Sequence, residues 1–271
     1  MLKDENLPAV HKPANLPAGI DPEDYKRIRE EDLKRSMEGV IPRLQQIKVL
    51  HAGALMFKFP ADETGKEERR EFFDGVIADS HLCRAWWKKS YEESGGGQRP
   101  DCSSLDALTG TKFVKCSECE YSKDNTGPKG EGTACKLMRR IHIFMEGSLL
   151  PYRLTVTITS IPIFDHFSTI LRTKGLYVYD HILHFSLDEA VSKEGFKYSK
   201  LHLNVVRQLE PENYLRLRDI LMSIEPQIRG QEIMRAEYED VPQPGNVEDL
   251  ESPIPPEDLD SEIEKDENMP F

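Results

Sequence analysis

The acidic residues of this chain are concentrated at its C-terminal end, and this limits which part of it can fold. Residues 231–271 contain fourteen Asp or Glu and two Lys or Arg, a net charge of −12 that equals the net charge of the whole chain. Residues 1–230 are therefore neutral. A block of like charge with little apolar content cannot bury enough surface to form a core. We expect a disordered acidic tail over 231–271 and a folded body that ends near residue 230.

The N-terminal part adds little to the expected core. Residues 1–20 are polar and interrupted by prolines, and a helix is predicted from Asp21 to Met37. Asp21 suits the N-cap, Pro22 suits the first turn, and the acidic residues that follow face the positive end of the helix dipole. Residues 1–39 are thus expected to be an arm and a helix, and residues 40–230 the globular domain.

The body contains mostly strand patterns. They predict strands over 47–59, 72–87, 140–145, 152–159, 176–187 and 196–209, and helices over 162–175 and 211–224. Long antiparallel strands with a helix among the later ones are typical of an OB-fold barrel. The predicted class is therefore mainly β with α: an OB-fold-like antiparallel barrel that carries a cysteine-bearing insertion at about 98–137.

Four of the five cysteines lie in this insertion, which has little apolar content of its own: Cys102, Cys116, Cys119 and Cys135. The central pair forms a CxxC motif, the spacing that lets two thiolates bind one tetrahedral ion. The flanking segments are long enough to bring the outer two cysteines back to it. We expect a structural Zn²⁺ with four thiolate ligands, because a segment without a core needs a metal to organise it. A closed site of this kind leaves no position for a reacting water.

The remaining potential ligands have other interpretations. Cys83 lies in a predicted strand and is expected to be a small buried side chain. His81 or His142 could replace one of the four cysteines, since sites with three thiolates and one imidazole are common.

Binding of single strands without sequence preference needs aromatic faces for the bases and cations for the phosphates. Segment 84–91 supplies both, and adjacent Trp86 and Trp87 should point to opposite faces of a strand, one into the core and one toward the binding face. The candidate strand-binding residues are Phe57, Lys58, Arg84, Trp86, Trp87, Lys88, Lys89, Tyr91, Lys112, Lys115, Arg139, Arg140, Tyr152, Arg153, Tyr177 and Tyr179.

The tail ends in the sequence Asp266-Glu267-Asn268-Met269-Pro270-Phe271. Proline stiffens this tip, and the terminal aromatic ring and carboxylate suit an apolar pocket ringed by cations. The tip resembles the C-terminus of bacterial single-stranded DNA-binding proteins, which end in an acidic stretch and Ile-Pro-Phe. The resemblance implies that Asp266, Glu267, Met269, Pro270 and Phe271 recruit replication, recombination and repair proteins, such as a polymerase, helicase, exonuclease or recombinase.

The whole chain is similar in architecture to zinc-containing single-stranded DNA-binding proteins of bacteriophages, which have an OB fold and an acidic C-terminus. Such a protein would coat and protect single strands and would not be an enzyme. No HExxH, Walker A or zinc-deaminase motif occurs in the sequence. The alternatives are a zinc-ribbon adaptor that binds other proteins, and a DNA-processing enzyme whose carboxylates follow no recognised motif.

The sequence also predicts a compartment. It has no run of 18 apolar residues and no apolar N-terminal segment of the secretory type. Five cysteines without an export signal indicate a reducing environment, in which thiols bind metals rather than form disulfides. We expect the cytoplasm of a bacterial host, without a membrane partner.

Overall fold

A computed structural model describes residues 21–37, 43–50, 54–61, 64–89, 93, 98–112, 115–127, 130, 132–148, 150–192, 195 and 197–237. The chain divides into two units, Met1–Asp240 and Val241–Phe271. All described residues belong to the first unit. The predicted acidic tip therefore lies outside the described residues.

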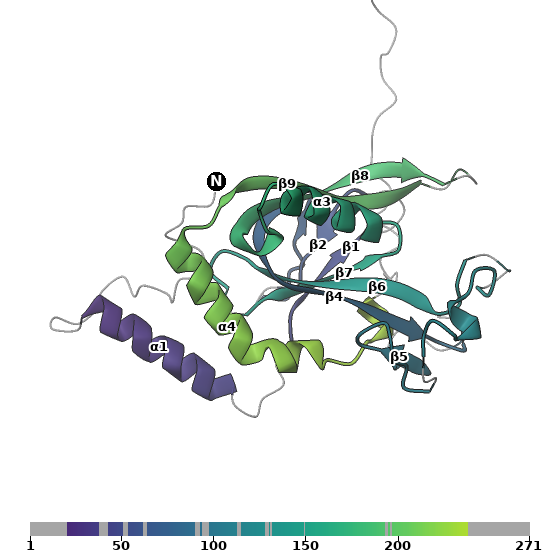
Figure 1. Cartoon of the computed structure of the whole chain (residues 1–271), viewed down its shortest axis with the longest axis horizontal. Helices are drawn as coiled ribbons and strands as arrows, with labels where there is room; N and C mark the ends of the chain where they lie inside the picture. Colours follow the sequence, from purple (N-terminus) through teal and green to yellow (C-terminus); the bar gives the residue numbers. More distant parts are fainter. Residues whose placement is uncertain are drawn as a thin grey trace, which may run out of the picture. The chain divides into compact units, whose positions relative to one another are not determined.

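The first unit is mainly β with some helix (Figure 1). Its strands are β1 Gln46–Val49, β2 Phe57–Lys58, β3 Arg69–Arg70, β4 Phe73–Trp86, β5 Cys102–Ser104, β6 Lys136–Phe144, β7 Tyr152–Thr157, β8 His181–Val191 and β9 Lys197–Gln208. Its helices are α1 Pro22–Met37, α3 Ile161–Thr173 and α4 Pro211–Arg229, with short 3-10 turns η2 Glu120–Ser122, η4 Val178–Asp180 and η5 Arg235–Glu237. None of the described helices is long and apolar enough to cross a membrane.

The nine described strands form one curled sheet, a half-barrel, in the order β3-β2-β1-β7-β6-β4-β8-β9, with β5 paired to β4. This confirms the barrel-like, mainly β class. The prediction of a wholly antiparallel sheet is wrong, because β1 runs parallel to β7, with Ile47 opposite Leu154. No hairpin joins these two strands, so no tight turn fixes their relative direction. The predicted strand 47–59 is likewise two strands, since β1 and β2 pair antiparallel.

The two faces of the sheet are covered by different elements. On the inner face, α3 buries Phe164 and Leu171 in the main core, together with Ile141, Leu183 and Phe185 from the strands. On the outer face, α4 packs a stripe of apolar residues with helical spacing against the sheet: Leu217, Ile220, Ile224 and Ile228. This stripe explains why α4 continues to Arg229, past the predicted end at residue 224.

Residues 231–237 belong to the folded body, although the sequence places them in the acidic tail. Ile233 packs against Cys83 and Met138 on the outer face. The buried guanidinium of Arg140 donates hydrogen bonds to the carbonyl oxygens of Gln231 and Glu232, at 2.6 and 2.8 Å. The boundary predicted at residue 230 is therefore too early, because the hydrogen-bond acceptors of the buried Arg140 lie beyond residue 230.

Candidate functional site

The largest partly exposed side chains of β4 point to the inner face of the sheet. In Figure 1, β4 and β6 extend past α3 toward β5. In this region the outward-pointing residues of β4, Cys83 and Ala85, are small and completely buried, and they pack with Ile233. The inward-pointing residues are half-buried. We define the inner strip as these and their neighbours on β6: Leu82, Arg84, Trp86, Leu137 and Arg139.

An aromatic pair closes one end of the inner strip. The rings of Trp86 and Tyr121 are stacked, with centroids 4.2 Å apart and planes 18° from parallel. Tyr121 lies in η2, within the cysteine-bearing segment. Trp86 also lies opposite Cys102 in the antiparallel pairing of β4 with β5. The pair therefore joins the end of the sheet to that segment. Both rings are half-buried, so part of their surface faces solvent.

Cations accompany these rings. The positive charge of Arg84 opposes the larger effect of burial, which raises the pKa of the Cys135 thiol. Arg139 lies over the ring of Phe164 at 4.7 Å and pairs with Asp165 at 2.6 Å. Lys88 and Lys89 are exposed directly after β4. Two further predicted lysines, Lys112 and Lys115, are exposed in the cysteine-bearing segment near Asp101 and Glu118, at 3.8 and 2.9 Å.

The two tryptophans occupy opposite faces, as adjacent residues should. Trp87 belongs to the outer face, where it packs beside Cys83 and Ala85. Its indole N–H donates to the Gln98 carbonyl oxygen at 3.3 Å, and the guanidinium of Arg235 lies 5.5 Å from its ring centroid. Trp87 is thus engaged with the C-terminal segment, which leaves Trp86 as the tryptophan of the inner strip.

Several predicted strand-binding residues do not belong to this surface. Phe57 and Arg140 are completely buried and Arg153 is 8% exposed, so these three predictions are corrected. Phe57 packs edge-on against Phe73 in the core, and both arginines bind Glu237. Lys58 pairs with Glu67, and Tyr152 is the first residue of β7, the strand next to β6. Tyr177 and Tyr179 lie just before β8, and Tyr91 lies outside the described residues.

The cysteine-bearing segment makes a turn at its CxxC motif, but its described cysteines do not form a closed sulfur cluster. The Cys119 N–H donates to the Cys116 carbonyl oxygen at 3.4 Å, and the Cys135 N–H donates to that of Tyr121 at 2.7 Å. Cys102, Cys116 and Cys135 are buried. Burial raises the pKa of the Cys135 thiol against the opposing effect of Arg84. Among the described residues, no three cysteine sulfur atoms lie within 4.8 Å of one another.

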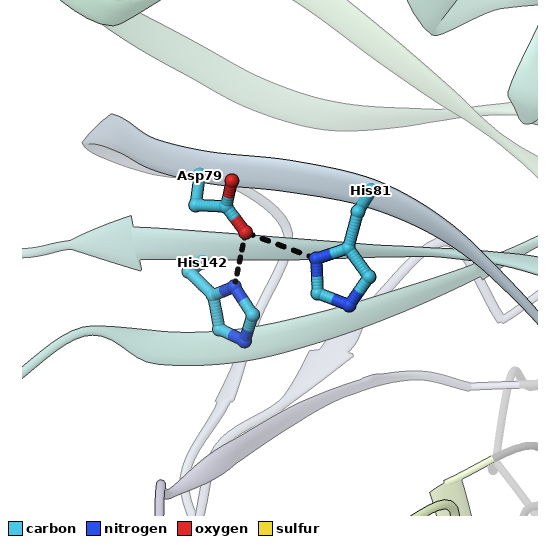
Figure 2. A group of neighbouring side chains, drawn as sticks. All are labelled: Asp79, His81 and His142. Carbon is cyan, nitrogen blue, oxygen red and sulfur yellow. Dashed lines mark hydrogen bonds and ion pairs between the residues drawn. The ribbon is translucent and has the colours of Figure 1, made fainter. Parts of the chain in front are cut away.

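A second polar cluster, which the sequence did not predict, lies on the outer face (Figure 2). The Nδ1 atoms of His81 and His142 lie 2.9 and 3.3 Å from the same oxygen of Asp79, and Arg229 donates to the other oxygen. Burial alone would raise the pKa of Asp79, but these hydrogen bonds hold it well below its usual range. Burial lowers the pKa of His142. The cluster does not support His81 or His142 as a substitute ligand in the cysteine set.

Comparison with known proteins gave no matching family model, and no curated protein or solved structure with significant similarity to this chain. The functional assignment therefore depends on the chain's own residues. Two sites stand out in the described part: the inner strip with its cysteine-bearing neighbour, and the buried cluster around Asp79.

Proposed function

We propose that this protein binds single-stranded DNA, without sequence preference and without catalysis, to coat and protect it during replication or recombination. The inner strip carries this proposal. Along the end of β4, the small side chains are buried and the large ones, Arg84 and Trp86, are only half-buried on the inner face. A side-chain pattern built only for packing would bury the large residues. The curled sheet would then serve as an OB-like platform for a single strand.

The contacts follow from the chemistry of the strip. The exposed parts of Trp86 and Tyr121 offer faces on which bases can stack, and every base has such a face. Arg84 would neutralise phosphates, together with Lys88 and Lys112, which lie in the segments before and after β5. Neither kind of contact reads a base edge, so binding would not depend on sequence.

The selectivity for single strands is testable by fluorescence anisotropy with a labelled oligo-dT and a labelled duplex of equal length. We expect clear preference for oligo-dT, and an affinity that falls steeply as salt rises, because each neutralised phosphate releases counterions. Equal affinity for the duplex would contradict the proposal. Absence of binding to either would favour the zinc-ribbon adaptor.

We also propose that Cys102, Cys116, Cys119 and Cys135 hold one structural Zn²⁺. The donor set fits, and backbone hydrogen bonds join Cys119 to Cys116 and Cys135 to Tyr121, two residues after Cys119. The ion would draw the sulfur atoms together and fix Tyr121 against Trp86.

Purified protein should accordingly contain about one zinc per chain in this set, as four thiolates complete a tetrahedral site. Strong chelation should disorder the segment, change the tryptophan fluorescence and weaken oligo-dT binding, while far-UV circular dichroism of the sheet is retained. Elemental analysis that finds no zinc or iron in fully active protein would overturn the assignment.

The acidic tip completes the proposal as the site that recruits partner enzymes in a bacterial cytoplasm. Pull-downs from host lysate can compare the full chain, a chain without Met269–Phe271, and a chain with Gly-Ser residues added after Phe271. Both changes remove the correctly placed aromatic carboxylate and should abolish capture. Capture of the same proteins by all three chains would rule the tip out. Longer deletions should begin at residue 241, because residues 231–237 are part of the fold.

A further inference from the structure

We infer that Asp79, His81 and His142 form a second metal site, in which the two imidazole Nε2 atoms bind a divalent transition-metal ion and Asp79 orients both rings. Among the described residues, these three are the group in which one potential ligand atom from each, a carboxylate oxygen of Asp79 and either nitrogen of each imidazole, lies within 4.8 Å of the others. The inference is independent of DNA binding and of the cysteine-bound zinc.

The hydrogen bonds to Asp79 define the state of the two imidazoles. The Asp79 carboxylate is paired with Arg229 and, when ionised, can only accept hydrogen bonds. Each Nδ1 must therefore carry the proton that it donates to Asp79. A neutral imidazole of this tautomer has its lone pair on Nε2. Such carboxylate–imidazole pairs are the usual support of metal-binding histidines, because the carboxylate fixes the ring and makes its other nitrogen a better ligand.

The Nε2 atoms of His81 and His142 make no hydrogen bond. Both atoms are buried, and among the described residues neither has a hydrogen-bond partner. The His142 side chain is completely buried and that of His81 is 10% exposed. A buried acceptor without a donor is unfavourable, and such groups are rare in folded proteins. A metal ion would satisfy both lone pairs at once.

The two rings are placed side by side. Figure 2 shows both on the same side of the carboxylate, with each Nε2 pointing away from Asp79. Their centroids are 5.5 Å apart and their planes are tilted by 31°. Metal–nitrogen bonds of about 2.0–2.1 Å place both Nε2 atoms around one ion. His81 is the less enclosed ring, so most of the ring movement that this arrangement needs would fall on it.

The surrounding charges permit a cation but limit its affinity. Arg140 and Arg153 come from β6 and β7, and both are paired with Glu237. Arg229, from the end of α4, is paired with Asp79 and Glu225. The charges of these three arginines and three carboxylates compensate one another. Each carboxylate is already bound to an arginine, so none of the three is left to bind the ion directly. Imidazole ligands select ions such as Zn²⁺, Ni²⁺, Co²⁺ or Cu²⁺. We expect weaker binding here than at four thiolates, and removal by milder chelation.

Titration of the full chain with Co²⁺, followed by calorimetry and by absorption spectroscopy, tests the site. Calorimetry counts the bound ions, and the absorption spectrum distinguishes thiolate-bound from imidazole-bound cobalt. The Cys116→Ser/Cys119→Ser variant should still bind one ion, without thiolate charge-transfer bands. His81→Gln and His142→Gln should each lose that ion. His184→Gln is the matched control, because His184 forms a single Asp–His pair with Asp74 at 2.7 Å and should leave the ion bound.

Two further readouts make the result decisive even if His142→Gln folds poorly. Metal should raise the melting temperature of the cysteine variant and not that of its His81→Gln derivative, since a ligand stabilises the state that binds it. Ring ¹⁵N spectra should show the metal-induced shift at the Nε2 atoms of His81 and His142. Binding that persists after His81→Gln, or an ion that shifts neither ring, would overturn the site.

Discussion

Replacing Glu237 with glutamine is expected to destabilise the fold by about 3–5 kcal/mol, because it leaves two buried arginines without a counter-charge. The Glu237 side chain is 2% exposed and lies 2.9 Å from Arg140 and 3.1 Å from Arg153. Burial already lowers the pKa of Arg153, and Glu237 opposes that effect. Urea unfolding followed by circular dichroism measures the change in free energy.

Glu225→Gln is the matched control. Glu225 also pairs with an arginine, Arg229, but within a helix and at a partly exposed position. Its loss should change the free energy of unfolding by less than about 1 kcal/mol. Similar losses for the two variants would show that the Glu237 cluster does not anchor residues 231–237.

The sequence predicts the elements of this fold better than their long-range pairing. The strand expected at 72–87 is β4, Phe73–Trp86, and the helix expected at 162–175 is α3, Ile161–Thr173. Alternating and helical patterns are local, so they are legible in one segment. The parallel pairing of β1 with β7 and the binding of Arg140 to Glu237 join segments far apart in the chain. No local pattern specifies either.

The candidate site shows the same division. The CxxC motif and the Trp86–Trp87 pair are visible as local motifs. The opposite orientations of the two tryptophans follow from strand geometry. The cluster around Asp79 was missed because His142 reaches it from another strand, β6. One signal was present: Asp79 and His81 are two residues apart in a predicted strand and therefore share a face. Arg140 was wrongly assigned to DNA because a buried arginine and an exposed one look alike in sequence.

Replacing Trp86 with alanine is expected to weaken binding of single-stranded DNA by about 1–3 kcal/mol, roughly 5-fold to 150-fold, through lost base stacking. The same change removes the partner of Tyr121. Trp87→Phe is the matched control, because Trp87 lies next in sequence but packs on the outer face near Arg235. It should alter stability and not affinity. Circular dichroism of both variants verifies that they are folded.

The dissociation constant for oligo-dT, measured side by side for the wild type, Trp86→Ala and Trp87→Phe at physiological salt, tests the proposed function most directly. Binding at the inner strip predicts that the wild type and Trp87→Phe bind alike, and that Trp86→Ala binds more weakly by roughly 5-fold or more. A wild-type protein that does not bind oligo-dT, or a Trp86→Ala variant that binds it as tightly as the wild type, would contradict the proposal.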